Sequence, residues 1–233
     1  MRVIIPVWAI DAETINITEE AINSLKGHEI VIVDNGSLVG GGQLREWANL
    51  YIRNKTNLGY AKAVNQGLKL SDFPVVVSNN DIRVSPNWYE VTQEILKLPK
   101  VGTIHYRMTL YNEPFKYGNH TWEEGRERWC TGSFFVIAQP AYFDENYLNS
   151  YDDWDLQVRA RKSGFKTIYT TKACYQHFDS FTQKKIVDTE RVARDKRNRE
   201  YFKSKHGEYP EDLYLRQFPD QMSRDWRKEF DEL

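Results

Sequence analysis

The first half of the chain alternates between short apolar runs and longer segments whose apolar residues recur at helical spacing. Short β-branched runs are typical of buried strands, and helical spacing is typical of amphipathic helices. The expected strands span residues 3–7, 29–33, 50–53, 73–78 and 101–106. The expected helices span residues 18–25, 43–49, 61–70 and 88–98, with Thr18 as the N-cap of the first. Strands joined by helical crossovers predict an α/β fold with a mainly parallel sheet flanked by helices.

The second half follows a different pattern. Residues 111–128 are polar and aromatic without a clear period, which predicts a hairpin or a long loop. Further strands are expected at 130–137, 166–170 and 172–176, and helices at 152–163 and 184–206. The 152–163 helix has acids at its start, bases toward its end and Gly164 as its C-cap, which suits the helix dipole. The charged 184–206 helix predicts a partly solvated outer element, and residues 208–233 predict a polar, partly helical tail.

Composition and charge narrow the class of protein. The chain has 233 residues, which fits one domain, and its 32 basic and 33 acidic residues give a net charge of −1. That balance gives no electrostatic footprint for nucleic acid or an anionic membrane. Cys130 and Cys174 have no metal-ligand spacing, which predicts reduced, buried thiols. The apolar run at 3–7 is far shorter than the roughly 20 residues of a membrane span, and no signal peptide is recognisable. We therefore expect a soluble, cytoplasmic protein.

Polar clusters follow three of the expected strands. They are Asp34-Asn35, Asn57-Leu58-Gly59 and Asn79-Asn80-Asp81. In doubly wound sheets, ligands bind at the carboxyl ends of the strands. Polar residues at one strand end are also ordinary turn chemistry, but three clusters on the same edge favour a ligand site.

Asp81 is a candidate metal ligand because a carboxylate beside a diphosphate is what a divalent cation needs. Mg²⁺ and Mn²⁺ prefer one or two carboxylates together with substrate phosphates. Such an ion would neutralise the charge that builds on a departing diphosphate. The alternative is a turn aspartate that caps the next segment. His177 follows the expected 172–176 strand, where a structural hydrogen-bonding role is the alternative to metal binding.

Three acids, Asp152, Asp153 and Asp155, stand at the start of the 152–163 helix. Helix capping explains one of them and at most two, because the dipole favours acids in the first turn. Like charges this close raise one another's pKa, which suits a general base. Both interpretations stay open from these residues alone.

In chain order, these motifs resemble the family 2 glycosyltransferases, and they are closest to the rhamnosyltransferase-like branch. The resemblance covers about residues 2–207. The motifs that carry it are Val33-Asp34-Asn35-Gly36-Ser37, Asn57-Leu58-Gly59-Tyr60-Ala61 through Asn65-Gln66-Gly67, Ser78-Asn79-Asn80-Asp81, Thr131-Gly132-Ser133-Phe134-Phe135, Phe143-Asp144-Glu145, Asp152-Asp153-Trp154-Asp155-Leu156 with Arg159, Gly164-Phe165 and His177. The resemblance implies a GT-A fold, which is Rossmann-like, over residues 1–207. Its nucleotide-binding half would be 1–106, its acceptor and catalytic half 107–207, and the C-terminal helical extension would follow.

The resemblance also implies a role for each matching residue. The donor, a UDP- or dTDP-linked sugar, would be bound by Pro6, Asp34, Asn57, Gly59, Lys62, Asn79 and Asn80. Asp81 and His177 would hold Mn²⁺ or Mg²⁺. Asp153, with Asp152 beside it, would take the proton of an acceptor hydroxyl, so that transfer inverts the anomeric carbon. The common acceptor in this family is a glycan of a cell-surface polysaccharide or of a lipid-linked precursor, and another hydroxyl acceptor, on a protein or a modified nucleic acid, is the alternative.

The acceptor or sugar pocket is expected at Gly132 and Trp129. The flat indole of Trp129 is suited to stacking on a sugar ring, and core packing is the alternative interpretation of that residue.

The chain departs from the family pattern at two positions. Asn79 stands where the metal-binding motif usually has its first acid, so metal binding would depend on the diphosphate of the donor. The usual Glu-Asp pair is Asp152-Asp153, one methylene shorter at its first position. That change leaves open which of the two acids reaches the acceptor.

Two rival functions fit a similar sheet. A nucleotidyltransferase would carry a glycine-rich basic loop near its N-terminus, and residues 6–10 lack one. A binding module on a degenerate transferase fold would recognise a nucleotide sugar or glycan without turnover. The presence of Asp81, Asp153 and His177 together argues against such a module.

Overall fold

The first strands of the sheet pair in parallel, as the sequence predicts. The computed structural model describes residues 1–123, 132–178 and 191–217. In it, β1 (Arg2–Val7) lies between β2 (Glu29–Asp34) and β4 (Val75–Ser78), and β3 (Leu50–Arg53) pairs with β2. These strands form because their apolar side chains are buried on both faces of the sheet, with Ile4 on one face and Val3 and Ile5 on the other.

The rest of the sheet is mixed. β8 (Phe134–Ile137) is antiparallel to β4 and to β6 (Val101–Leu110), and β6 is parallel to β9 (Lys166–His177). Two short strands, β5 (Ile82–Val84) and β7 (Thr121–Glu123), are antiparallel to β9. Within the described residues the order is β3-β2-β1-β4-β8-β6-β9-β5, with β7 beside β9. The two strands expected at 166–170 and 172–176 are therefore one strand, whose register against β6 shifts after Tyr106.

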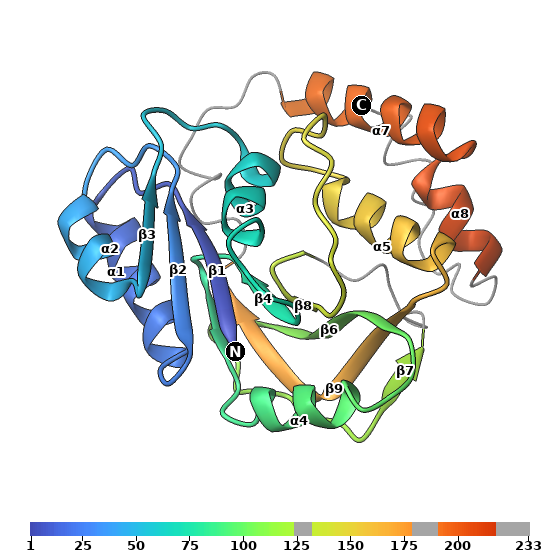
Figure 1. The fold of residues 1–233 in the computed structure, drawn as a ribbon, viewed down its shortest axis with the longest axis horizontal. Helices are drawn as coiled ribbons and strands as arrows, with labels where there is room; N and C mark the ends of the chain where they lie inside the picture. The colour runs from blue at the N-terminus through green and yellow to red at the C-terminus, as the bar shows by residue number, and fades with distance from the viewer. Residues whose placement is uncertain (124–131, 179–190, 218–233) are drawn as a thin grey trace.

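Helices cover both faces of the sheet (Figure 1). They are α1 (Ala12–Ser24), α2 (Gly41–Trp47), α3 (Tyr60–Leu68), α4 (Trp88–Ile95), α5 (Asp152–Lys162), α7 (Arg191–His206) and α8 (Pro210–Gln217). Residues of α1, α2 and α4 share a core with one face of the sheet, and residues of α3 and α5 share a core with the other. The fold is thus α/β with a sheet flanked by helices.

The predicted start of the first helix is wrong. α1 begins at Ala12, and its N-cap is Asp11, whose Oδ1 accepts a hydrogen bond from the Thr14 amide at 2.8 Å. Thr18 lies inside the helix, where its hydroxyl donates to the Thr14 carbonyl at 2.7 Å. The sequence does not distinguish the two roles of threonine, because a threonine at an N-cap and a threonine that hydrogen bonds to the preceding turn inside a helix stand in similar sequence patterns.

The C-terminal helices pack onto α5. A separate cluster of buried side chains joins them, consisting of Tyr147, Tyr151, Val158, Phe202 and Leu213. Leu213 belongs to α8, so part of the predicted polar tail is packed against the domain. Of the segment expected as one helix at 184–206, the described part is α7. The division of the chain at residue 207 stays a prediction.

Two further predictions concern membrane-spanning helices and the state of the cysteines. Within the described residues, no helix combines the length and the apolar character that crossing a membrane requires. Cys174 is a buried free thiol, and Cys130 lies outside the described residues.

Candidate active site

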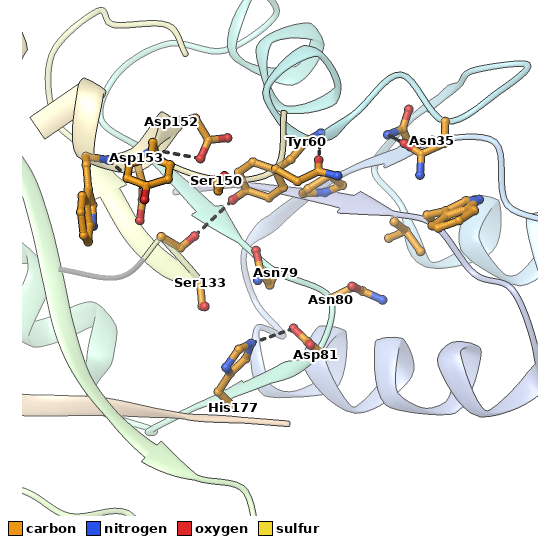
Figure 2. Close-up of a pocket in the computed structure, with 18 of the residues that line it drawn as sticks. Asn35, Tyr60, Asn79, Asn80, Asp81, Ser133, Ser150, Asp152, Asp153 and His177 are labelled. Carbon is orange, nitrogen blue, oxygen red and sulfur yellow. Dashed lines mark hydrogen bonds and ion pairs between the residues drawn. The ribbon is translucent and has the colours of Figure 1, made fainter. Parts of the chain in front are cut away.

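One cavity of about 570 Å³ brings most of the predicted site residues together (Figure 2). The predicted residues that line it are Pro6, Asn57, Asn79, Asn80, Asp81, Gly132, Asp152, Asp153 and His177. Three predicted donor contacts, Asp34, Gly59 and Lys62, are not part of the lining, and Trp129 lies outside the described residues.

The polar clusters at the strand ends hydrogen bond to one another. The side-chain amide nitrogen of Asn35, Nδ2, donates to Asn57 Oδ1 at 2.8 Å and to the Gly59 carbonyl at 3.2 Å. Asn35 Oδ1 in turn accepts from the Leu58 amide at 3.0 Å. Gly59 starts α3 with a φ of 87°, a conformation that favours glycine. These contacts fix the loop that follows β3 against the end of β2.

Asp34 is fully buried beside the cavity rather than in its wall. Its Oδ1 accepts from the Ser37 amide at 2.8 Å, and its Oδ2 accepts from the Tyr51 hydroxyl at 2.5 Å and from Arg53. The ion pair with Arg53 offsets the cost of burying the carboxylate. A donor contact by Asp34 stays a prediction, as it does for Gly59 and for the exposed Lys62.

Strand pairing places Asp81 beside His177. Asp81 immediately precedes β5, and Ile82 of β5 pairs with His177 at the end of β9. The Phe178 amide donates to the Asp81 carbonyl at 3.0 Å, which closes the junction. Asp81 Oδ1 lies 3.3 Å from His177 Nε2, and the two side chains are only 8% and 11% exposed.

The Asp81–His177 pair fits a divalent cation. Both atoms are buried, and apart from their contact with each other neither Asp81 Oδ1 nor His177 Nε2 has a hydrogen-bond partner within the described residues. A carboxylate oxygen and an imidazole nitrogen are both common ligands of such ions. The described part of the chain holds no group of three or more such ligands, so the remaining ligands would come from phosphate oxygens and water.

Asp152 and Asp153 open α5 and line the cavity apart from Asp81 and His177 (Figure 2). Burial raises the pKa of the Asp152 carboxyl to about 7, and the neighbouring Asp153 charge adds to that effect. Burial also raises the pKa of the Asp153 carboxyl to about 6, although the backbone amides of Trp154 and Gly132 oppose the rise. Asp152 is 5% exposed, whereas Asp153 is only partly buried. The pair is therefore suited to taking up a proton near neutral pH.

The third acid of the same turn has a structural role. Asp155 is fully buried and contacts Arg159, Lys205 and His206 at 2.6, 2.7 and 2.8 Å. Burial raises the pKa of its carboxyl, but hydrogen bonds from His206 and Lys205 outweigh that effect and the pKa is lowered. Asp155 thus stays ionised and joins α5 to the end of α7.

Further lining residues were not predicted as site residues. They are Val7, Trp8, Asn35, Tyr60, Ser133, Asn149, Ser150, Tyr151, Trp154 and Arg194. Tyr60 donates its hydroxyl to the Gly132 carbonyl at 3.2 Å. Burial, with the Asp152 and Asp153 charges nearby, raises its pKa well above the ordinary value, so the phenol stays protonated. Tyr60 belongs to a recognised motif, whereas nothing in the charged pattern of α7 marks Arg194.

Comparisons with known proteins agree with this arrangement. A family model described as Glycosyl transferase family 2 matches residues 3–158. A comparison with curated proteins gives no match.

Solved structures share the fold. S. aureus TarS 1-349 is 17% identical with a TM-score of 0.58, over 75% of this chain and 58% of that one. The same protein in complex with UDP-GlcNAc is 16% identical with a TM-score of 0.58, over 77% and 60%. GalNAc-T7 with UDP, GalNAc and Mn²⁺ is 14% identical with a TM-score of 0.61, over 76% and 43%. The chain thus spans less than two thirds of each of these proteins.

Proposed function

The chain belongs to glycosyl transferase family 2, and we propose that it moves a sugar from a nucleoside diphosphate to an acceptor hydroxyl with inversion at the anomeric carbon. One observation carries the proposal. A single cavity holds both the Asp81–His177 pair, which suits a divalent cation, and the Asp152–Asp153 pair, which suits a base. An inverting transfer needs a base for the acceptor hydroxyl and stabilisation of the departing diphosphate, and these two pairs would supply them.

Asp153 is the proposed base. The acceptor hydroxyl gives its proton to the Asp153 carboxylate and attacks the anomeric carbon. A new carbon–oxygen bond forms as the bond to the diphosphate oxygen breaks, and the electron pair leaves with the diphosphate. Asp153 is favoured over Asp152 because it is the more exposed of the two. Asp152 Oδ1 accepts from the Asp153 amide at 3.0 Å, so Asp152 also orders the first turn of α5.

The residues at the ends of β4 and β9 would stabilise the departing diphosphate. Asp81 and His177 would hold Mn²⁺ or Mg²⁺, which would neutralise the charge on the departing diphosphate. Asn79 lines the cavity and its Oδ1 has no hydrogen-bond partner within the described residues, which supports a contact between Asn79 and the donor. The Asn80 amide donates to Thr18 Oγ1 at 2.9 Å, which fixes the loop that carries Asp81.

For the donor we propose a UDP- or dTDP-linked sugar. The neighbouring structures with UDP and UDP-GlcNAc support a pyrimidine nucleotide. The lining residues Pro6, Trp8 and Asn57 offer the flat and polar surfaces that a base needs. The acceptor is proposed to be a glycan in polysaccharide synthesis, and the rhamnosyltransferase-like branch stays a prediction.

A donor screen separates this function from a binding module without turnover. The chain is incubated with UDP- and dTDP-sugars and Mn²⁺, and released nucleoside diphosphate is measured. We expect one donor to be hydrolysed slowly without acceptor. A donor that binds with no release, even when glycan acceptors are added, would favour the binding module instead.

A further inference from the structure

The turn that leads into the acidic pair is held in an unusual backbone conformation. Asn149 and Tyr151 have φ angles of 57° and 67°, in the left-handed region that side chains rarely adopt. Tyr151 is the residue immediately before Asp152 and caps α5 in this conformation. Such strained backbone conformations persist only where several surrounding contacts hold them in place. The contacts around residues 148–151 therefore decide where Asp152 and Asp153 point.

Helix α7 supplies most of these contacts. The Asn198 side chain is 1% exposed and donates to the Leu148 carbonyl at 3.0 Å, the Ser150 carbonyl at 3.2 Å and Ser150 Oγ at 2.8 Å. Ser150 Oγ in turn donates to Asp195 Oδ1 at 2.8 Å. Asn198 and Asp195 are three residues apart and therefore lie on the same face of α7, and both contact Ser150 Oγ. Neither residue lines the cavity.

Contacts with two other parts of the fold hold the residues on either side of the acidic pair. The Tyr60 amide at the start of α3 donates to Asn149 Oδ1 at 3.0 Å, on the nucleotide side of the cavity. At the other end of α7, Lys205 and His206 contact Asp155 in the first turn of α5. The segment that carries the acidic pair is thus clamped between α3 and α7.

We infer that Asn198 and Asp195 are positioning residues of the transferase, which hold the 148–151 turn so that Asp153 faces the acceptor. This inference rests on the proposed function. It assigns α7, a charged helix outside the residues that the family model matches, to the support of the catalytic acid. A buried asparagine is suited to this role because the two hydrogens of its amide can reach two backbone carbonyls, here those of Leu148 and Ser150.

The test compares Asn198→Ala and Asp195→Ala with a control, Asn87→Ala. Asn87 Nδ2 also donates to a backbone carbonyl, that of Lys172 at 2.9 Å, but it lies away from the cavity. Hydrogen exchange of the 146–156 segment, donor affinity by calorimetry and kcat are measured for each folded variant. The exchange measurement needs no turnover, so it decides the positioning role even if no donor is hydrolysed.

We expect Asn198→Ala to lose exchange protection in the 146–156 segment and to lower kcat by about 10²-fold, with donor affinity kept. Asp195→Ala, which removes one hydrogen bond to the turn where Asn198→Ala removes three, should show a smaller loss in the same direction. The control should change neither quantity. Unchanged protection of the segment in Asn198→Ala would overturn the inference, as would wild-type kcat in that variant. An absence of turnover in the wild type would instead count against the proposed function.

Discussion

Gly132 packs directly against Asp153. A Cβ atom at position 132 would lie 2.9 Å from Asp153 Cβ and 3.0 Å from its Oδ2. The Gly132 amide also hydrogen bonds to the Asp153 carboxylate, and the Gly132 carbonyl accepts from Tyr60. The glycine therefore defines the wall against which the proposed base is placed.

Gly132→Ala should displace the Asp153 carboxylate. Since a misplacement of about 1 Å can cost about 10²-fold in rate, we expect kcat to fall on that order while donor affinity changes little. Steady-state kinetics and calorimetry check this. Gly42→Ala is the control, because a Cβ there meets nothing within 4 Å. Wild-type kcat in Gly132→Ala would show that the contact is not needed.

Asp81→Ala should remove the effect of Mn²⁺ on donor binding. The variant leaves His177 without its carboxylate partner at 3.3 Å, so an ion would keep only one protein ligand. Titrating UDP and UDP-GlcNAc by calorimetry with and without Mn²⁺ measures the effect. Asp72→Ala, at a residue that does not line the cavity, is the control. If Mn²⁺ strengthens binding equally in Asp81→Ala and the wild type, the metal role is wrong.

The transfer rate should fall at acid pH. The base must be ionised, and burial raises the pKa of Asp153 to about 6, so kcat should drop as the pH falls through about 6. An unperturbed aspartate would place this drop near pH 3.9. Measuring kcat and donor affinity over the same pH range separates the base from effects on binding. A kcat that stays constant down to about pH 4.5 would contradict a raised pKa of the base.

Asp152→Asn should stabilise the fold at neutral pH. The folded-state pKa of Asp152 is raised to about 7, so the folded protein binds this proton more tightly than the unfolded chain does. Stability from this group is thus present at low pH and is lost as the pH rises from about 4 to 7. Asparagine removes the buried charge, so the melting temperature should rise at pH 7.5 and change little near pH 4. An equal change at both values would contradict the raised pKa.

The sequence predicts the parallel strands well because their apolar runs are buried on both faces, and Leu50–Arg53 matches its predicted bounds. It also predicts part of the cavity lining, since loops at the carboxyl ends of strands converge, but Asp34, Gly59 and Lys62 do not line the cavity. It could not show that Asp81 and His177 touch, because that contact depends on β5, a strand of three residues, in register with β9.

The contacts of α7 with the 148–151 turn could not be predicted from the sequence either. Its sequence is charged and without a marked apolar stripe, which favours a solvated helix. Asn198 contacts the 148–151 turn only because the chain returns over α5, and that long-range path has no local signal.

Asp153→Asn tests the central claim most directly. The substitution keeps the shape of the side chain and removes its capacity to take a proton, while Asp152→Asn serves as the matched comparison. Transfer to an acceptor and donor affinity are measured in parallel, with the donor identified by nucleoside diphosphate release. We predict that Asp153→Asn binds the donor as the wild type does and loses transfer by about 10²–10⁴-fold, more than Asp152→Asn does. Transfer at the wild-type rate by Asp153→Asn would contradict the account.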